Sequence, residues 1–485
     1  MDLTVILVFT AIALLAGIIA PGRWKVGFLL VCSLAAIFWL QAALPLRNLD
    51  FWLPAVSVGL VVLTWAATRP SQPPVDGESV SWRLELPAAL IISGTLFAIG
   101  LTRYTGPACC LTATRPPPIW QVLLAVGLWT GLVWLVYRVK SRQGWIATSL
   151  VVVILALLVV LKTPDLSLAA SLFWRRLGGQ SIQLAAASDF AWLGYSYLAF
   201  RLVHALRDFQ AGKLPAYSLA DFVTYAVFFP SWVAGPIDRS QRWIAESNAL
   251  KPVQQTDRTE GLWRILLGVF KKFVLADGLA LVALNSQNAA QIQSTGWAWL
   301  ILFAYALRIF FDFSGYTDIA IGLARLAGFH LPENFDRPYL KTNLTLFWNS
   351  WHMTLAQWFR AYYFNPLARS LRGRGKGKIT IPAWAIILIA QVTTMLLIGL
   401  WHGITLNFAF WGLWHGAGLF IHNRWSEWMR PRSASLENRP GLQRTLKFSG
   451  WLLTFNFVVL GWIWFALPSP EMAWNYVRLL FGLGS

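Results

Sequence analysis

Histidine is the side chain in this sequence best suited to moving protons near neutral pH. Two of the six histidines stand beside tryptophan in apolar stretches: His402 in Leu-Trp-His-Gly (residues 400–403) and His352 in Trp-Asn-Ser-Trp-His (residues 348–352). An imidazole held by a hydrogen bond at one nitrogen can accept a proton at the other, as a general base must. The other four are His204, His330, His415 and His422.

His402 lies between two apolar segments that leave little room for a surface loop. The neighbouring Gly399 and Gly403 permit close approach of another backbone or of a substrate. A proton-transfer role and a purely structural role both fit this local pattern. His415 follows thirteen residues later. It would lie about 140° away on a continuous helix, so we expect it to pack against a neighbouring helix.

His352 belongs to residues 346–360, where Trp348 and Phe359 recur on the same side of a helix as the histidine. The spacing predicts one amphipathic or re-entrant helix, with tryptophan at the membrane interface and Arg360 at the water. On the local pattern alone, an interface helix anchored by tryptophans is the preferred interpretation of His352.

The other ionisable residues in apolar stretches predict structural roles. His204 lies in a basic helix end and is expected at the membrane interface, His330 is expected to mark a helix end, and His422 opens a basic segment. The Gly/Pro-interrupted residues 228–239 are expected to line a cavity. We expect two ion pairs along one helix, Arg308 with Asp312 and Asp318 with Arg325.

Neither a metal site nor a protein nucleophile is predicted. The sequence has no His-Glu-x-x-His, Cys-x-x-Cys, Gly-x-Ser-x-Gly or Gly-x-x-x-x-Gly-Lys-Ser/Thr pattern. A helix-rich chain with two buried histidines fits direct attack of an acceptor hydroxyl on an activated acyl group. That reaction needs only a base and a reactive donor such as a thioester.

The elements that must position these residues are predicted to be membrane helices. The 485 residues carry a net charge of +19, yet 57% are hydrophobic and 13% charged, whereas soluble chains are about 25% charged. This composition excludes an ordinary soluble enzyme and a disordered chain, and it makes lipid a better partner than nucleic acid. Three cysteines, Cys32, Cys109 and Cys110, form no disulfide framework.

Long apolar stretches predict about 11–13 spans or half-spans, so we expect a multi-pass protein of the cell membrane. The basic loops 138–142, 369–378 and 424–447 are expected on the cytoplasmic side. The N-terminal helices, residues 1–180, are simple aliphatic runs and are expected to be scaffold, whereas residues 181–485 carry the polar motifs. The expected stretches are residues 3–20, 26–44, 51–67, 86–101, 119–137, 145–161, 182–200, 262–284, 297–326, 381–400, 405–421 and 448–467.

Several ordered motifs resemble the membrane-bound O-acyltransferase family, specifically its polysaccharide-modifying branch with alginate O-acetylation proteins and D-alanyl transferases of lipoteichoic acid. Leu-Trp-His-Gly (400–403) resembles the element that carries the family's invariant histidine, and Trp-Asn-Ser-Trp-His (348–352) resembles the element of its second histidine. The first 180 residues depart from this pattern. The remaining motifs lie at residues 229–237, 311–322, 332–339, 411–416 and 461–465.

The resemblance implies an all-α polytopic bundle, a ring of tilted helices around a central tunnel, that transfers an acyl group from a cytoplasmic thioester to a hydroxyl. No bound cofactor is implied. The donor would be acyl-CoA or an acyl carrier protein, the acyl group acetyl, and the acceptor an envelope polysaccharide or a relay protein. The alternative is a transporter for a lipid-linked sugar, without acyl-transfer chemistry.

The resemblance also implies roles for individual residues. His402 would be the general base or orient the hydroxyl, and His352 would position the thioester or assist the proton transfer. A basic stretch could attract the anionic donor, although the topology rule explains the same charges. The tunnel-shaping residues would be Trp401, Asn407, Asn349 and Trp351, and the basic stretch is Arg369, Arg372, Arg374, Lys376 and Lys378.

Overall fold

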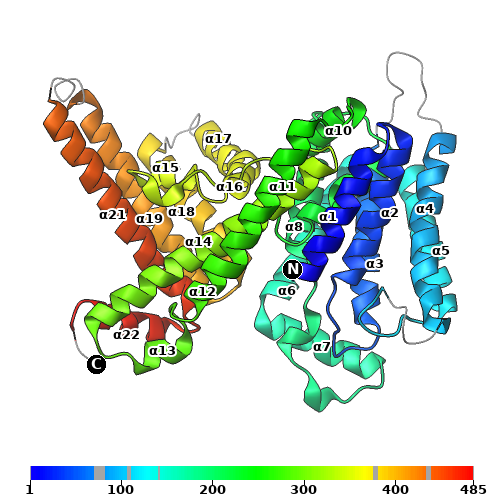
Figure 1. The fold of residues 1–485 in the computed structure, drawn as a ribbon, viewed down its shortest axis with the longest axis horizontal. Helices are drawn as coiled ribbons and strands as arrows, with labels where there is room; N and C mark the ends of the chain where they lie inside the picture. Colours follow the sequence, from blue (N-terminus) through cyan, green and yellow to red (C-terminus); the bar gives the residue numbers. More distant parts are fainter. Residues whose placement is uncertain are drawn as a thin grey trace. The chain divides into compact units, whose positions relative to one another are not determined.

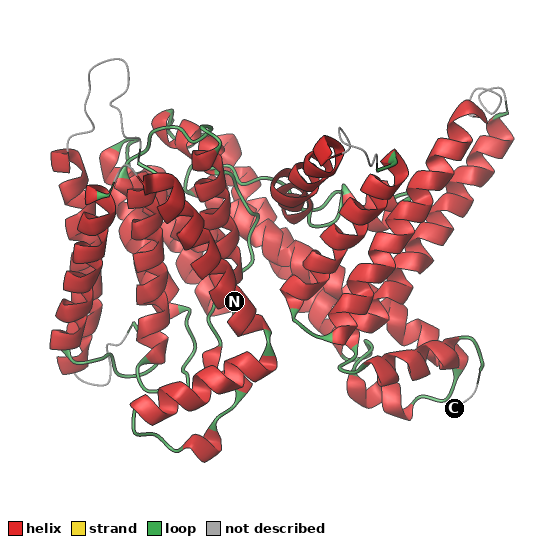
Figure 2. Ribbon diagram, turned by 180° about the vertical axis from the view of Figure 1, so that it is seen from behind, coloured by secondary structure: helices red, strands yellow, loops and turns green. Residues whose placement is uncertain are grey.

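The computed structural model describes residues 2–69, 82–105, 111–139, 142–374, 381–432 and 439–483. These residues are mainly helical, with one isolated antiparallel bridge between Phe335 and Trp351 as their β structure (Figures 1 and 2). The predicted all-α polytopic class is confirmed, while the ring of helices around a tunnel stays a prediction. The chain forms two compact units, Met1–Ile265 with Ile319–Pro332 and Leu266–Asp318 with Glu333–Ser485.

The first unit is built around α3, whose apolar stretch is 83% buried because it packs against α5, α8 and α9. By contrast, the apolar stretches of α5 and α6 are 6% and 11% buried. Their outward leucine, valine and tryptophan side chains suit contact with lipid. The helices are α1 (Leu3–Ile18), α2 (Arg23–Trp39), α3 (Leu49–Ala67), α4 (Trp82–Leu101), α5 (Ile119–Arg138), α6 (Gln143–Lys162), α7 (Pro164–Leu177), α8 (Tyr195–Gln210), α9 (Leu219–Val227), α10 (Ser240–Asn248) and the greater part of α11 (Gln255–Val269).

A buried ion pair fastens the loop before α8 to α7. The guanidinium of Arg175 donates to Asp189 Oδ2 from Nε at 2.9 Å and from Nη2 at 2.8 Å, and the Ser171 hydroxyl donates to the same oxygen at 2.6 Å. Burial alone would raise the pKa of Asp189, but these hydrogen bonds outweigh it and lower that pKa. The carboxylate is therefore ionised and fully paired at neutral pH.

Asp189→Ala should lower the free energy of unfolding by about 3–5 kcal/mol, because the Arg175 charge would stay buried without its partner. Thermal unfolding of the purified protein in lipid nanodiscs measures the loss. The double variant Arg175→Met/Asp189→Leu is the control, because replacing both ions by apolar groups is often neutral. An unchanged midpoint in Asp189→Ala would contradict the prediction.

The second unit is dominated by the antiparallel pair α18 and α19, against which α21 packs (Figure 1). The short helices α15 and α16 lie between this group and α14, and α22 packs against α13 and α21. The helices are α12 (Asp277–Ala280), α13 (Ser286–Gln291), most of α14 (Thr295–Leu326), α15 (Leu344–Trp348), α16 (Met353–Phe359), α17 (Asn365–Arg374), α18 (Ala383–His402), α19 (Leu406–Met429), α21 (Pro440–Ala466) and α22 (Pro470–Leu480).

Seven of the described helices are long and apolar enough to cross a membrane. One predicted span is wrong as a continuous helix. Residues 182–200 form short turns before α8 begins, because Gly194 has a φ of +76° and the Trp232 ring occupies the space of its missing side chain. The predicted stretch 262–284 is helical as far as Ala280, and a π-helical turn at Phe270–Ala276 joins the end of α11 to α12.

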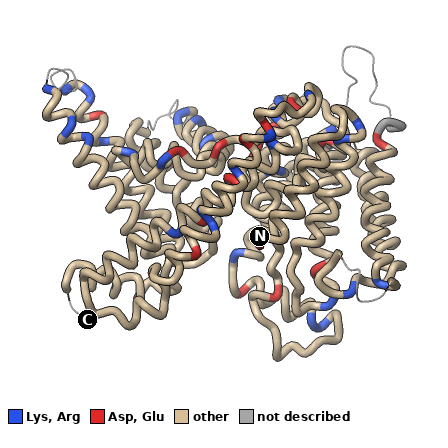
Figure 3. The backbone as a smooth tube through the Cα atoms, viewed as in Figure 1, with Lys and Arg blue, Asp and Glu red and all other residues tan. Residues whose placement is uncertain are grey.

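Basic residues gather at one end of the second unit. Figure 3 shows lysine and arginine on α17 and at the adjoining ends of α19 and α21, whereas the opposite end around α13 and α22 is almost free of charge. The described parts of the basic loops 369–378 and 424–447 therefore lie at the same end of this unit. This end is here called the basic end, and its place on the cytoplasmic side, which the positive-inside rule predicts, stays a prediction.

Candidate active site

The close packing of α18 against α19 positions His402, the last residue of α18. Gly412 faces Met395 O, where an added Cβ would lie 2.6 Å away, and Gly416 faces Val392 Cα, where it would lie 2.9 Å away. At Gly399, an added Cβ would collide with the carbonyl oxygen of Phe408. These glycines let the two backbones touch, as the sequence predicts for Gly399.

Gly399→Ala should force the two helices apart one turn before His402 and lower stability by about 1–3 kcal/mol, the usual cost of overpacking. The midpoint of thermal unfolding in nanodiscs measures this loss of stability. Gly441→Ala is the matched control, since that glycine in the first turn of α21 has nothing within 4 Å of the added atom. Equal midpoints for the two variants would show that the close approach at Gly399 is unimportant.

Aromatic rings surround His402. Its ring centroid lies 4.6 Å from that of Trp401, 4.8 Å from Phe465 and 5.7 Å from Trp411. Its position at the C-terminus of α18 suits a ring that gains a proton, because the helix dipole stabilises positive charge there by about 0.3–1 kcal/mol. His402 is only half-buried, contrary to the expectation of a buried histidine, and the aromatic rings cover part of its imidazole.

His352 is held in a different way from the predicted helix. α15 ends at Trp348, and His352 begins α16 with a φ of +43°, a left-handed conformation that is strained for a residue other than glycine. The antiparallel contact of residues 334–336 with residues 350–353 imposes this geometry: Met353 N–H donates to Asn334 O, and Asp336 N–H to Ser350 O. The predicted continuous helix with Trp348, His352 and Phe359 on one face is therefore wrong.

Asn334 fixes the protonation pattern of His352. Its Oδ1 accepts hydrogen bonds from Thr354 N–H at 3.2 Å and Thr354 Oγ1 at 2.8 Å, and it lies 3.1 Å from His352 Nδ1. The backbone N–H can only donate, so the amide atom facing it is the oxygen, and Nδ1 of His352 must carry a proton. His352 lies outside the candidate spans, and burial lowers its pKa to about 3. The ring is thus neutral, with its lone pair on Nε2.

Trp401 brings the two histidines together. Its ring centroid lies 6.4 Å from that of His352 and 4.6 Å from that of His402. Residues fifty positions apart in the sequence thus meet across one indole. Phe313 of α14 completes this group with an edge contact to His352 at 4.7 Å.

The remaining predicted tunnel residues have distinct places. Asn349 accepts a hydrogen bond from Arg360 Nη2 at 2.6 Å. Trp351 is buried against Trp462, with ring centroids 5.1 Å apart, and does not contact His402 directly. Asn407 is buried on α19, and its amide donates to the carbonyl of Leu467.

The predicted donor-docking residues lie only partly within the described chain. Arg369 and Arg372 are exposed on α17, which packs on α18 through Ala368. Arg374 ends α17, and Lys376 and Lys378 lie outside the described residues, as do Cys109 and Cys110.

His415 packs against a neighbouring helix, as predicted: its ring lies 5.1 Å from that of Trp348 in α15 and 4.8 Å from that of Trp411 in its own helix, and it is fully buried. Neither ring nitrogen has a hydrogen-bond partner among the described residues. An added Cβ on Gly461 of α21 would lie 2.8 Å from its Nε2, so a glycine there is what admits the histidine.

Both expected ion pairs along α14 are wrong. Asp312 pairs with Lys272 at 2.8 Å and Asp318 with Lys271 at 2.6 Å, while Arg325 pairs with Glu260. The partners come from α11 and the π-helical turn that follows it. The wide π-helical turn places both neighbouring lysines toward α14, which the local spacing within α14 could not reveal.

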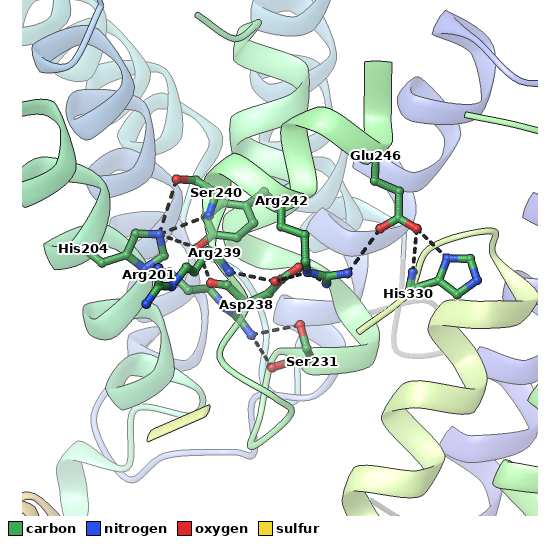
Figure 4. Close-up of polar contacts among 10 residues, drawn as sticks. Arg201, His204, Ser231, Asp238, Arg239, Ser240, Arg242, Glu246 and His330 are labelled. Carbon is green, nitrogen blue, oxygen red and sulfur yellow. Dashed lines mark hydrogen bonds and ion pairs between the residues drawn. The ribbon is translucent and has the colours of Figure 1, made fainter. Parts of the chain in front are cut away.

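A polar cluster in the first unit corrects the expectation for His204. Figure 4 shows this histidine beside Ser240, whose N–H donates to His204 Nε2 at 3.2 Å, and it is fully buried rather than interfacial. Arg201 donates to the carbonyls of Ala226 and Ser231 at 2.9 and 2.6 Å. Within the irregular residues 228–239, Arg201 thus satisfies the backbone carbonyl of Ser231, and the predicted place of this segment along a cavity stays a prediction.

The same cluster extends to the loop after α14. Arg242 pairs with Asp238 and with Glu246, and Glu246 lies 2.5 Å from His330 Nδ1 (Figure 4). His330 does lie beyond the end of α14, as predicted, and its partner is the carboxylate of Glu246. This cluster fastens loops and is separate from the group around Trp401.

Asn334 and Phe465 are among the site residues that the sequence did not indicate as single positions. Asn334 stands in the Pro-Glu-Asn-Phe-Asp-Arg-Pro-Tyr motif, but a lone asparagine gives no sign of its distant partner. Phe465 stands in the Gly-Trp-Ile-Trp-Phe motif and looks like any core aromatic. The motif positions were the available signal for both.

Comparisons with known proteins find several similar sequences. The chain is 34% identical to the probable alginate O-acetylase AlgI of Pseudomonas aeruginosa over 295 residues, 60% of this chain and 52% of that protein. It is 28% identical to the teichoic acid D-alanyltransferase of Bacillus subtilis, over 72% of this chain and 83% of that one. The chain is 32% identical to the peptidoglycan O-acetyltransferase of Helicobacter pylori, over 55% of this chain and 48% of that protein.

The chain spans about half the length of the alginate O-acetylases it matches. The sequence model of the membrane-bound O-acyltransferase family matches residues 143–463, which include His352, Trp401 and His402. With seven apolar helices among its described residues, the chain is an integral membrane protein and belongs to the membrane-bound O-acyltransferase family.

Proposed function

We propose that this protein is an O-acyltransferase that moves an acyl group, acetyl in the simplest case, from a cytoplasmic thioester to a hydroxyl of an envelope polysaccharide or of a relay protein. The observation that carries the proposal is the meeting of His352 and His402 across Trp401. The relatives' names describe acyl transfer to alginate, teichoic acid and peptidoglycan.

The proposed reaction needs no covalent enzyme intermediate. The imidazole of His402 takes the proton of the acceptor hydroxyl as its oxygen attacks the thioester carbonyl carbon. The carbon–sulfur bond then breaks, and the thiolate takes the proton back from the imidazolium. One ester and one thiol result, and His402 returns to its neutral form. The aromatic rings that cover part of the His402 imidazole favour the transfer by limiting competing water.

The tautomer of His352 bears on its role. A ring whose Nε2 carries the lone pair can accept a proton or a hydroxyl hydrogen bond, but it cannot donate to a thioester carbonyl. We therefore favour assistance in the proton transfer over positioning of the donor. Asn349, Asn407, Trp351 and Trp401 would shape the path around the two histidines.

Donor docking at α17 is a further part of the proposal. The exposed Arg369 and Arg372 lie at the basic end, where an anionic coenzyme A thioester or acidic carrier protein would arrive. Arg374, Lys376 and Lys378 would add positive charge that attracts the same anionic donor.

Arg369→Gln/Arg372→Gln should raise the KM for acetyl-CoA several-fold without changing kcat, because surface charge acts on encounter more than on chemistry. The KM of the wild-type protein should rise with salt concentration, and the KM of the variant should rise less. Thiol release in nanodiscs at two ionic strengths measures both. An unchanged KM at low salt would show that these charges do not attract the donor and only set the orientation of the protein in the membrane.

Mass spectrometry of the cell envelope tests the function itself. Cells with the intact gene should carry alkali-labile acyl esters on an envelope glycan or protein, and cells lacking it should lose them. Complementation with His402→Gln should not restore the esters. Unchanged esters in the deletion strain would overturn the proposal, and accumulation of a lipid-linked sugar on one membrane face would favour a transporter.

A further inference from the structure

The adjoining ends of α19 and α21 form a positively charged surface at the basic end (Figure 3). Six basic side chains stand against one acidic side chain, Glu427, in the described part of residues 424–447. Glu427 pairs with Arg424, which leaves an excess of positive charge on the others. The other five basic side chains are exposed and are here called the basic cluster: Arg430, Arg432, Arg439, Arg444 and Lys447.

The length of α21 places part of this cluster at the depth of lipid headgroups. Its 27 residues correspond to about 40 Å, whereas the hydrocarbon core of a bilayer is about 30 Å thick. Arg444 and Lys447 lie within about 11 Å of the start of the helix. When the apolar residues 448–466 span the core, these two side chains reach the phosphates of the adjoining leaflet.

One exposed face of α19 changes in character toward the same end. Ile421, Trp425 and Trp428 follow one another at helical spacing, and each is more than half exposed. The rings of the two tryptophans lie 5.0 Å apart, and Arg432 Cζ lies 4.0 Å from the centroid of the Trp428 ring. The order is apolar, then aromatic, then cationic, which matches the order of acyl chains, interface and phosphates in one leaflet.

We propose that the basic cluster binds the phosphate of an anionic phospholipid through Arg430 and Arg432. The guanidinium group suits this ligand because its planar fork can donate to two phosphate oxygens at once. The Trp428 ring holds the Arg432 guanidinium in place, so less freedom is lost when the lipid binds. The acyl chains of the same lipid would lie along Ile421 and Trp425. This inference does not depend on acyl transfer.

The apolar face of α19 favours a lipid over other anions. A soluble phosphate would contact the arginines but would leave the exposed Ile421 and Trp425 without a partner. An acidic protein at this depth would have to displace lipid from the same face. A phospholipid meets both requirements, because its charge and its chains belong to one molecule.

Lipid binding to the purified protein in a neutral detergent tests the proposal, with fluorescent phosphatidylglycerol as the probe and microscale thermophoresis as the readout. The wild-type protein should bind this lipid more tightly than phosphatidylcholine with the same chains, and its Kd for phosphatidylglycerol should rise with salt concentration. Arg430→Gln/Arg432→Gln should raise the Kd for phosphatidylglycerol by roughly 5- to 25-fold, because each basic residue near an anionic surface contributes a factor of about five. The Kd for phosphatidylcholine should not change.

Two further double variants control for net charge and for the guanidinium fork. Arg23→Gln/Lys251→Gln removes the same charge from exposed positions of the first unit and should keep the wild-type Kd. Arg430→Lys/Arg432→Lys keeps the charge without the fork and should show an intermediate Kd. The midpoint of thermal unfolding shows whether each variant is folded.

Three results would overturn the proposal. The first is equal affinity of the wild-type protein for the two lipids, and the second is an equal loss of affinity in the two glutamine double variants. The third is displacement of phosphatidylglycerol by glycerol 3-phosphate or coenzyme A at concentrations comparable to that of the lipid, which would indicate a site for soluble anions.

Discussion

His402→Ala is expected to insert and fold as the wild-type protein does and to lose acyl transfer. General-base catalysis contributes about 10²- to 10⁴-fold, so turnover should fall by that factor. The ring contacts Trp401 and Phe465 and lies at the end of α18, where its loss disturbs no described helix interior. Free thiol released from acetyl-CoA in nanodiscs, with envelope glycan present, measures the rate.

His330→Ala serves as the matched control. That histidine is half exposed in the first unit and pairs with Glu246 and Asp257, so its removal should cost little stability and leave turnover unchanged. The thermal midpoint of each variant separates lost chemistry from lost folding. Wild-type turnover in folded His402→Ala protein would show that another group is the base.

Asn334→Leu is expected to reduce turnover by roughly 10²-fold or more, because His352 would lose the acceptor that fixes its tautomer and orientation. The same change leaves the N–H and hydroxyl of Thr354 without their acceptor, so stability should fall by about 1–3 kcal/mol. Turnover at a temperature well below the unfolding midpoint separates the two effects.

Asn334→Asp distinguishes positioning from packing. A carboxylate still accepts from His352 Nδ1, so most activity should return. Its negative charge should raise the pKa of His352, and a base with a higher pKa loses activity at a higher pH. The acid limb of the pH–rate profile should therefore shift upward relative to wild type.

Asn456→Leu is the control for the asparagine substitution, since that side chain bonds only to the Leu452 carbonyl of its own helix among the interactions seen for it. It should keep the wild-type rate and profile. If Asn334→Asp is as inactive as Asn334→Leu, or its acid limb does not move, Asn334 has a packing role alone.

The sequence by itself determined the class of protein and the segments that matter. Apolar length and low charge predict membrane helices whatever surrounds them, because every backbone group in lipid must be bonded within its own segment. The sequence predicted a close backbone approach at Gly399, and in the structure Gly399 packs against the backbone carbonyl of Phe408. The two histidines were singled out by the motifs that resemble the family, because the local pattern alone fitted structural roles as well.

Only the tertiary structure decided how those histidines are held and what lies beside them. Local spacing predicted a helix through His352, but pairing with residues 334–336 imposes a left-handed turn there. Local spacing also did not reveal that lysines outside α14 pair with Asp312 and Asp318. Nor did it reveal that His204 is fully buried. Helical periodicity reports neighbours within one segment, whereas the partners of Asn334 and Trp401 are set by contacts between segments far apart in the chain.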